Sequence, residues 1–300
     1  MRTHMTPRGT IALERSRAMD YITLMKPELT FLSVLTALAG YYLGAGGIIG
    51  GPGLLHTLLG TAMVGGGSGA LNQYIERRYD GLMRRTENRP LPSGRIAPVE
   101  ALLVGLLLSS GGILYLAICV NMLTSLLAAV TCATYVWLYT PLKRLTPYAT
   151  LIGGIPGALP PVMGWTAATG EITGGAIVLF GILFFWQMPH FLSLAWMYRK
   201  DYARAGYRLL AVSDEGGRKT ASQAILHTSL LIPVSLLLVG RGGAGIIYGV
   251  SAALLGGGFL LFALLLYARR SSASAKRLFF VSLLYLPALL LAMVIDRALR

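Results

Sequence analysis

The sequence carries little charge for its length. Only 13% of its 300 residues are Asp, Glu, Lys or Arg, and 55% are hydrophobic, whereas roughly a quarter of residues are charged in soluble domains. A soluble chain of this size could bury a core without so many long apolar runs. The low charge therefore argues against a soluble globular protein and indicates an integral membrane protein.

Acidic residues and cysteines are especially scarce. Twelve Asp and Glu stand against 26 Lys and Arg, giving a formal net charge of +14. The basic residues lie between apolar runs, so we expect the lipid bilayer and an anionic substrate as partners and no nucleic acid. The two cysteines, Cys119 and Cys132, lie within apolar runs and lack metal-site or disulfide spacing, so we interpret them as small core residues.

Long apolar runs recur along the chain. A helix needs about 20 mostly apolar residues to cross a bilayer, and nine segments qualify, which predicts an all-α polytopic membrane protein built as a bundle of nine transmembrane helices. One membrane domain would cover residues 28–296, between a polar lead (1–27) and a short tail (297–300). The predicted spans are roughly 28–47, 54–73, 99–119, 122–141, 148–168, 174–195, 223–240, 244–267 and 278–296.

The basic residues also predict an orientation. If the N-terminus is cytoplasmic, every Lys and Arg lies in the lead or a cytoplasmic loop except Arg241, Arg297 and Arg300. Cytoplasmic loops are enriched in these residues, so we expect the C-terminus on the opposite side. The lead is too weak a signal for a mitochondrial transit peptide, which favours the cell inner membrane. Two long cytoplasmic cap loops, about 77–98 and 197–222, are where we expect the active site.

Three oxygen-bearing side chains share one helical stripe at the cytoplasmic end of the second predicted span. Asn72, Glu76 and Asp80 are four residues apart, a spacing that places them on one face of a helix. Mg²⁺ prefers one or two carboxylates, several waters and substrate phosphate oxygens. The stripe therefore predicts a site for a diphosphate bridged by magnesium.

Four arginines follow this stripe in the first long loop: Arg84, Arg85, Arg89 and Arg95. Arginine can bind phosphate through two parallel hydrogen bonds. The alternative is a solvated basic loop with helical salt bridges. It explains the arginines but not the two carboxylates at the edge of the membrane, where ionisable groups are energetically costly.

A second polar cluster ends the sixth predicted span. Tyr198 and Asp201 are three residues apart and can share a helical face. The two helix ends could face each other across one cavity and hold two Mg²⁺ ions. Other residues at the same rim are Tyr139, Lys143, Arg144 and Lys26. For these cations, a role in membrane topology alone remains the alternative.

Two intramembrane features complete the pattern. His190 follows Pro189 inside the sixth span, where it is either a haem ligand or a hydrogen-bonded interior histidine. The fifth span is dense in glycine and proline between Gly153 and Trp165. This composition predicts a broken or kinked helix that lines a pocket, with close packing as the alternative.

Together these blocks resemble the UbiA-like intramembrane prenyltransferases, and more closely their protohaem IX farnesyltransferase (haem O synthase) family, over nearly the whole chain. The matching blocks are Tyr21-x-x-Leu24-x-Lys26-Pro27, Asn72-x3-Glu76-x3-Asp80-x-x-Met83-x-Arg85-Thr86-x-x-Arg89-Pro90-Leu91, Tyr139-Thr-Pro-Leu-Lys143-Arg144, Gly157-Ala-Leu-Pro160-Pro161, Pro189-His190-Phe191 and Asp201-Tyr202-x-x-Ala205-Gly206.

The resemblance implies transfer of the farnesyl group of farnesyl diphosphate to a vinyl group of haem b, with addition of water, and a Mg²⁺ cofactor. It makes a haem A synthase or terminal-oxidase assembly proteins candidate partners. It implies metal ligation by Asn72, Glu76, Asp80 and Asp201. It implies diphosphate contacts from Lys26, Arg85, Arg89, Tyr139 and Lys143, and the position of Arg144 at the same rim adds it to this set. The two polar clusters predict catalytic roles for Glu76, Asp80, Tyr198 and Asp201, and haem binding is one of the two interpretations of His190.

The chain departs from the family pattern at two places, Ala149 and the run Leu209-Leu210-Ala211. Both bear on substrate preference rather than on the class of reaction. Three alternatives stay open at this point. They are a UbiA-like enzyme that prenylates an aromatic quinone precursor, a membrane transporter, and a haem-handling assembly factor without catalysis.

Overall fold

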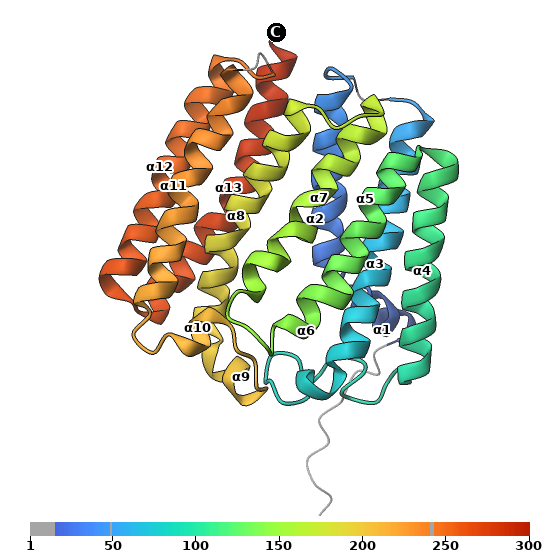
Figure 1. The fold of residues 1–300 in the computed structure, drawn as a ribbon, viewed down its shortest axis with the longest axis vertical. Coiled ribbons are helices and arrows are strands. Elements are labelled where there is room, and N and C mark those ends of the chain that lie inside the picture. Colours follow the sequence, from blue (N-terminus) through green and yellow to red (C-terminus); the bar gives the residue numbers. More distant parts are fainter. Residues whose placement is uncertain (1–15, 49, 241–242) are drawn as a thin grey trace, which may run out of the picture.

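The computed structural model describes residues 16–48, 50–240 and 243–300. Most of the predicted polar lead, residues 1–15, and Arg241 lie outside the described residues. Within the described part of the chain, nine long helical segments run along one direction as a bundle (Figure 1). The all-α fold predicted from the sequence is therefore confirmed.

The long helices follow the predicted spans closely. They are α2 (Pro27–Gly44), α3 (Pro52–Asp80), α4 (Pro98–Cys119), α5 with its continuation (Met122–Leu142), α7 (Ala149–Thr169), α8 (Gly174–Met197), α11 (Arg218–Gly240), α12 (Ile246–Arg269) and α13 (Ser272–Ala298). Each of α2, α3 and α4 begins at a proline, whose fixed φ suits the first helical position.

Six of these helices are long and apolar enough to cross a membrane, or seven if α1 (Arg17–Leu24) and α2 form one span bent by 53°. Helices α3 and α7 are not among them, and both are rich in glycine. Both are covered by neighbouring helices along much of their length. The number nine for membrane spans thus stays a prediction.

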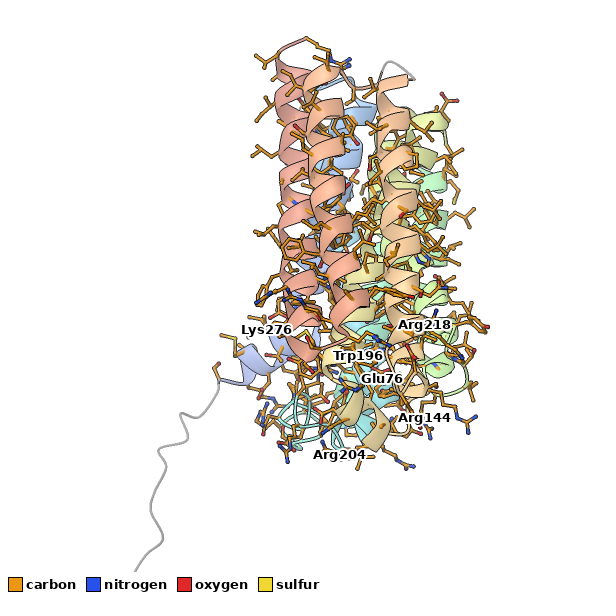
Figure 2. All side chains as sticks on the ribbon, turned by 90° about the vertical axis from the view of Figure 1, so that its left-hand side faces the viewer. Glu76, Arg144, Trp196, Arg204, Arg218 and Lys276 are labelled. Atoms are coloured by element: carbon orange, nitrogen blue, oxygen red, sulfur yellow. The ribbon has the colours of Figure 1, made fainter. Side chains whose placement is uncertain are left out.

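The loops that carry the polar motifs gather at one end of the bundle. Helix α1, the loop after α3, and the short helices α9 (Arg199–Arg204) and α10 (Leu210–Ser213) all lie there, whereas the chain ends at the opposite end (Figure 1). The labelled side chains Arg144, Arg204 and Arg218 mark the same end in Figure 2. Helix α1 occupies the last part of the predicted lead.

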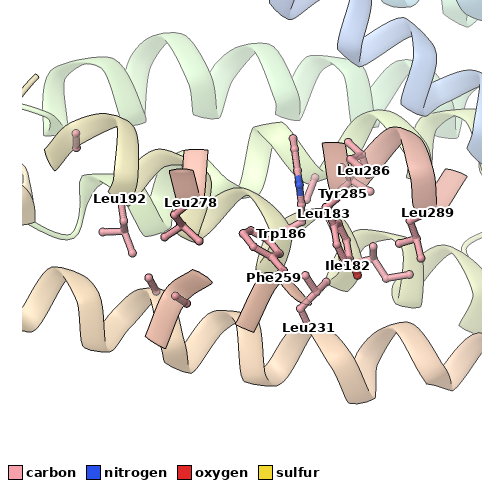
Figure 3. Close-up of a cluster of buried hydrophobic side chains, with 14 of the residues drawn as sticks. Ile182, Leu183, Trp186, Leu192, Leu231, Phe259, Leu278, Tyr285, Leu286 and Leu289 are labelled. Carbon is pink, nitrogen blue, oxygen red and sulfur yellow. The ribbon is translucent and has the colours of Figure 1, made fainter. Parts of the chain in front are cut away.

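The largest core lies between α8, α11, α12 and α13. Its buried side chains include Ile182, Trp186, Leu231, Phe259 and Tyr285 (Figure 3). The indole nitrogen Nε1 of Trp186 donates to the Ser282 carbonyl oxygen at 2.7 Å. This bond satisfies a polar group that would be costly to leave unpaired in an apolar interior. The core thereby fixes α8, which carries His190, against α13.

Helices α2 and α7 approach each other so closely that only glycine fits at the crossing. A Cβ on Gly40 would overlap the carbonyl oxygen of Pro161, and one on Gly164 would overlap that of Ala37. Small residues let membrane helices pack backbone to backbone. Of the predicted break or kink in α7, the break is wrong, because the helix runs continuously through Pro156, Pro160 and Pro161. Its predicted place beside a pocket is confirmed, as described below.

We expect Gly164→Val to destabilise the bundle, because the new side chain would push against the α2 backbone rather than a movable side chain. Overpacking of this kind costs about 3 kcal/mol, and thermal unfolding of the detergent-purified protein should show the loss. Gly258→Val is the matched control, since nothing lies within 4 Å of a Cβ there. Equal melting temperatures for the two variants would contradict the close α2–α7 crossing.

Candidate functional site

A cavity of about 270 Å³ opens inside the loop end of the bundle. Helices α2, α3, α7 and α8 supply its walls, together with the end of the fourth predicted span and the cap loops. Its charged lining residues all come from helix ends and loops: Lys26, Glu76, Asp80, Arg85, Arg89 and Lys143. Deeper along the helices the lining is mainly apolar and aromatic, from residues such as Val64, Leu183 and Phe191. The cavity is therefore charged at one end and apolar at the other.

The polar stripe of α3 lies at the charged end, and each of its members has a cationic partner. Glu76 accepts a hydrogen bond from Lys143 Nζ at 2.8 Å, and Asp80 accepts one from Arg89 Nη1 at 2.7 Å. Both carboxylates are buried, 4% and 1% exposed. Figure 2 shows Glu76 near the loop end. Buried charges are tolerated when paired in this way.

Asn72, the third member of the stripe, is fully buried behind the cavity wall. Its side-chain oxygen accepts from Lys26 Nζ, and its amide nitrogen donates to Thr140 Oγ1 at 2.7 Å. Lys26 Nζ also donates to the Tyr135 hydroxyl at 3.2 Å. Asn72 therefore holds Lys26 at the cavity. In this arrangement the side-chain oxygen and nitrogen of Asn72 both have hydrogen-bond partners.

Two tyrosines reach the cavity from a π-helical turn, η1 (Thr134–Tyr139), between α5 (Met122–Ala133) and α6 (Thr140–Leu142). Such turns inside helices are frequent at functional sites. The Lys143 ammonium lies 4.5 Å from the centroid of the Tyr139 ring, within cation–π range. Tyr135, absent from the sequence prediction, precedes Tyr139 by four residues, so helical spacing was the signal that could have found it.

The cations of the cavity differ in how firmly they hold their protons. Burial lowers the pKa of Lys26 to about 7, and the charges of Arg89 and Lys143 act in the same direction. Burial is the largest single influence on Lys143 and lowers its pKa, but Glu76 together with Tyr139, Tyr135 and Tyr207 raises that pKa above its usual value. An anion entering the cavity would favour the charged form of Lys26. The backbone of Lys26 is in the left-handed region, with φ 51°, a strained conformation typical of functional sites.

The second polar cluster meets the first through arginine and tyrosine rather than through carboxylates. Arg85 Nη2 donates to the Tyr202 hydroxyl at 3.3 Å, and its guanidinium lies 5.5 Å from the Tyr198 ring centroid. Tyr202 and Tyr207 line the main cavity. Asp201 instead forms an ion pair with Arg204 and lines a separate pocket together with Tyr198.

Two further predicted residues lie at contrasting positions. Arg144 is on the outer rim, where its Nη1 donates to the Tyr79 hydroxyl at 2.5 Å, and it does not line the cavity. His190 lines the cavity from α8. The predicted residues that the cavity brings together are thus Lys26, Glu76, Asp80, Arg85, Arg89, Tyr139, Lys143 and His190.

A metal site built from protein alone is not present among the described residues, where no three His, Cys, Asp or Glu side chains converge. One observation nevertheless fits a cation shared with a ligand. Asp80 Oδ1 is buried and makes no hydrogen bond within the described chain. An unpaired acceptor beside a second carboxylate suits Mg²⁺, which needs few protein ligands when phosphate oxygens and water supply the rest.

Known proteins share both the sequence and the fold. Residues 33–284 match the UbiA prenyltransferase family. The chain is 48% identical to the protoheme IX farnesyltransferase of Salinibacter ruber over 92% of this chain and 98% of that protein. It is 37% identical to the mitochondrial protoheme IX farnesyltransferase of Arabidopsis thaliana over 92% of this chain and 64% of that protein.

Solved structures share the fold at low sequence identity. A digeranylgeranylglyceryl phosphate synthase structure superposes with a TM-score of 0.80 at 18% identity, covering 95% of this chain and 99% of that one. A UbiA homologue from Archaeoglobus fulgidus, bound to DMAPP and Mg²⁺, gives 0.64 at 17% identity, covering 91% and 99%. UbiA homologues with this fold therefore bind Mg²⁺ together with prenyl diphosphates.

We expect Lys143→Met to destabilise the protein, because it leaves Glu76 buried without its ion-pair partner. Removing one member of a buried pair costs about 3–5 kcal/mol. The double variant Lys143→Met with Glu76→Gln should recover much of this loss, since no uncompensated charge remains. Thermal unfolding of four proteins, the wild type, Lys143→Met, Glu76→Gln and the double variant, measures the coupling. Additive effects of the two substitutions would contradict the pairing of Glu76 with Lys143.

Proposed function

Since the chain belongs to the UbiA prenyltransferase family, among the protohaem IX farnesyltransferases, we propose how its cavity transfers a farnesyl group from farnesyl diphosphate to haem b. The observation that carries the proposal is the two-ended cavity. Its charged end suits a diphosphate, and its apolar end suits a prenyl chain and a flat hydrophobic acceptor. An amphiphilic substrate would match both ends at once.

Four cations of the cavity would bind the diphosphate: Lys26, Arg85, Arg89 and Lys143. Three of them already contact the α3 stripe, so the substrate would enter a ring of oriented donors. Donors fixed in advance stabilise charge that develops on a leaving group without further reorganisation. The Tyr139 hydroxyl, from the π-helical turn, would add a neutral donor at the same end.

Glu76 and Asp80 would hold Mg²⁺ between the stripe and the diphosphate. The bound ion would supply positive charge to the diphosphate oxygens as the bond to carbon breaks. Asp80 Oδ1 is the atom best placed to serve, because it has no hydrogen-bond partner in the described chain. Asp201, paired with Arg204, would join this site only if its side chain leaves that ion pair for the cavity.

In the proposed reaction, the allylic C–O bond breaks and its electron pair leaves with the diphosphate. The π electrons of a haem vinyl group then form the new C–C bond to farnesyl. Water adds to the resulting haem cation and loses a proton, which leaves a hydroxyl group. The apolar walls, including Leu183 and Trp186, would keep bulk water from the farnesyl cation until the C–C bond has formed.

The membrane arrangement supports the same assignment. The protein is a multi-pass membrane protein, and we propose that residues 28–296 form one membrane domain whose loop end faces the cytoplasm of a bacterial inner membrane. The excess of basic residues at that end supports the orientation. A transporter, the alternative from another class, would more often bind its substrate near the membrane midplane, whereas Glu76 and Asp80 lie at a helix end.

Incubation of the purified protein with haem b, farnesyl diphosphate and Mg²⁺ tests the proposal. We expect extracted haem to be heavier by one farnesyl group plus water, as measured by mass spectrometry, and unchanged when EDTA is present. Unchanged haem with released diphosphate would indicate another acceptor, such as a quinone precursor. Unchanged haem with intact farnesyl diphosphate would overturn the enzyme assignment in favour of transport or haem handling.

Asp80→Asn should lower turnover about 100-fold or more, the scale on which loss of a group that stabilises developing charge acts, because one metal ligand is lost. Asp20→Asn is the matched control. Asp20 is also a buried carboxylate paired with an arginine, Arg95, at 2.9 Å, but it lies outside the cavity. The control should lose some stability and keep its activity. Equal activity in both variants would contradict the role of Asp80.

A further inference from the structure

The ring of His190 is hydrogen-bonded to a serine on another helix. Nδ1 of His190, on α8, lies 2.8 Å from Ser282 Oγ on α13. The same hydroxyl donates to the carbonyl oxygen of Phe279 at 2.5 Å. A serine hydroxyl has a single hydrogen, and a carbonyl oxygen can only accept. With that hydrogen given to Phe279, Ser282 Oγ accepts from His190, so Nδ1 carries the ring proton.

The protonated Nδ1 defines the state of the other ring nitrogen. In a neutral imidazole only one nitrogen bears a hydrogen, so Nε2 has a lone pair. No hydrogen bond to Nε2 occurs within the described ranges 16–48, 50–240 and 243–300. The ring lines the cavity, and besides Ser282 it lies against the aromatic rings of Trp186, Phe191 and Phe279. His190 thus offers an unshared lone pair within an apolar part of the cavity.

The same serine also fixes how the histidine ring is oriented. Ser282 accepts from Trp186 Nε1 through its backbone carbonyl at 2.7 Å. The His190 ring stacks against Phe279 and Trp186, with centroid separations of 4.7 and 5.5 Å and interplanar angles of 27° and 21°. Hydrogen bond and stacking together restrict rotation of the imidazole. A histidine that served packing alone would gain nothing from a second ring nitrogen left without a partner.

We propose that Ser282 is a positioning residue that holds His190 in the Nδ1–H form, so that Nε2 binds the iron of haem b during the transfer. The inference rests on the proposed function, since haem b is the acceptor there. Histidines that bind metal nearly always donate their other N–H to a second group, which fixes the tautomer and the ring orientation. The neutral imidazole is the form that coordinates a metal.

The position of His190 suits an iron ligand beside the reacting ends of the substrates. His190 is seven residues before the end of α8, which corresponds to about 10 Å along the helix axis. Haem held there would lie in the apolar part of the cavity, with its edge toward the charged end where the diphosphate would bind. Iron coordination would then fix the distance between the vinyl group and the allylic carbon.

The test compares four variants with the wild type, using ferric haem b titrated into purified protein and followed by visible absorption and electron paramagnetic resonance. His190→Ala should lose the histidine-ligated spectrum, and added imidazole should restore it. Ser282→Ala should weaken haem binding about 10- to 100-fold, as loss of such a supporting group typically does. It should raise KM for haem b and leave farnesyl diphosphate binding, measured by calorimetry with Mg²⁺, unchanged.

Two control variants distinguish a positioning role of Ser282 from general destabilisation of the protein. Ser282→Thr keeps the hydroxyl and should retain the wild-type spectrum. Ser235→Ala removes another fully buried serine hydroxyl, which lies outside the cavity, and should also retain it. Loss of the spectrum in Ser235→Ala, or full haem affinity in Ser282→Ala, would overturn the role of Ser282. An unchanged spectrum in His190→Ala would overturn iron binding by His190.

The outcomes separate this inference from the proposed function. If wild-type protein forms farnesylated haem while His190→Ala and Ser282→Ala keep wild-type haem spectra and affinities, the inference fails and the function stands. If the wild type shows a histidine-ligated haem that Ser282→Ala weakens, yet forms no farnesylated product, the inference stands and the function fails.

Discussion

Two carboxylates are buried at the end of an apolar helix bundle, and the need to pair them with cations determines the arrangement of the site. Glu76 and Asp80 are nearly inaccessible to solvent, and an unpaired carboxylate in such a place would cost several kcal/mol. Each is therefore paired with a cation from a different element, Lys143 after α6 and Arg89 in the cap loop. These pairs tie the end of α3 to its surroundings. They also bring the cations of the cavity together before any ligand arrives.

This pairing has a consequence for substrate binding. A diphosphate that enters the cavity would share cations that carboxylates already hold, and Mg²⁺ would take over part of the carboxylate charge. Binding would then exchange partners among groups that are already desolvated, which avoids most of the cost of stripping water from free lysines and arginines. Lys26 and Arg85 are the exceptions, because amide and tyrosine groups rather than carboxylates are their partners in the described chain. Burial has lowered the pKa of Lys26 to about 7, and an arriving anion would favour its charged form.

Close helix packing makes this arrangement possible. The glycine-mediated crossing of α2 with α7 fixes the middle of α2. The segment before α2, where Lys26 adopts its left-handed backbone conformation, lies close to Gly69 of α3. The core between α8 and α13 fixes the opposite wall, including His190 and Ser282. The cap loops close the charged end through Arg85 and the tyrosines of the second cluster. The result is an apolar cavity with one charged end, which suits a substrate that joins a prenyl chain to a diphosphate.

The sequence by itself determined the helices and the chemistry of the stripe. Long apolar runs must be helical in lipid, because no water is present to satisfy the backbone, and spacing of four residues places Asn72, Glu76 and Asp80 on one face. Only the tertiary structure decided the partners. Glu76 pairs with Lys143, 67 residues away, and His190 meets Ser282, 92 residues away. Periodicity records which face of a helix a residue occupies, whereas its partner depends on how separate helices pack and turn against each other, which local sequence does not encode.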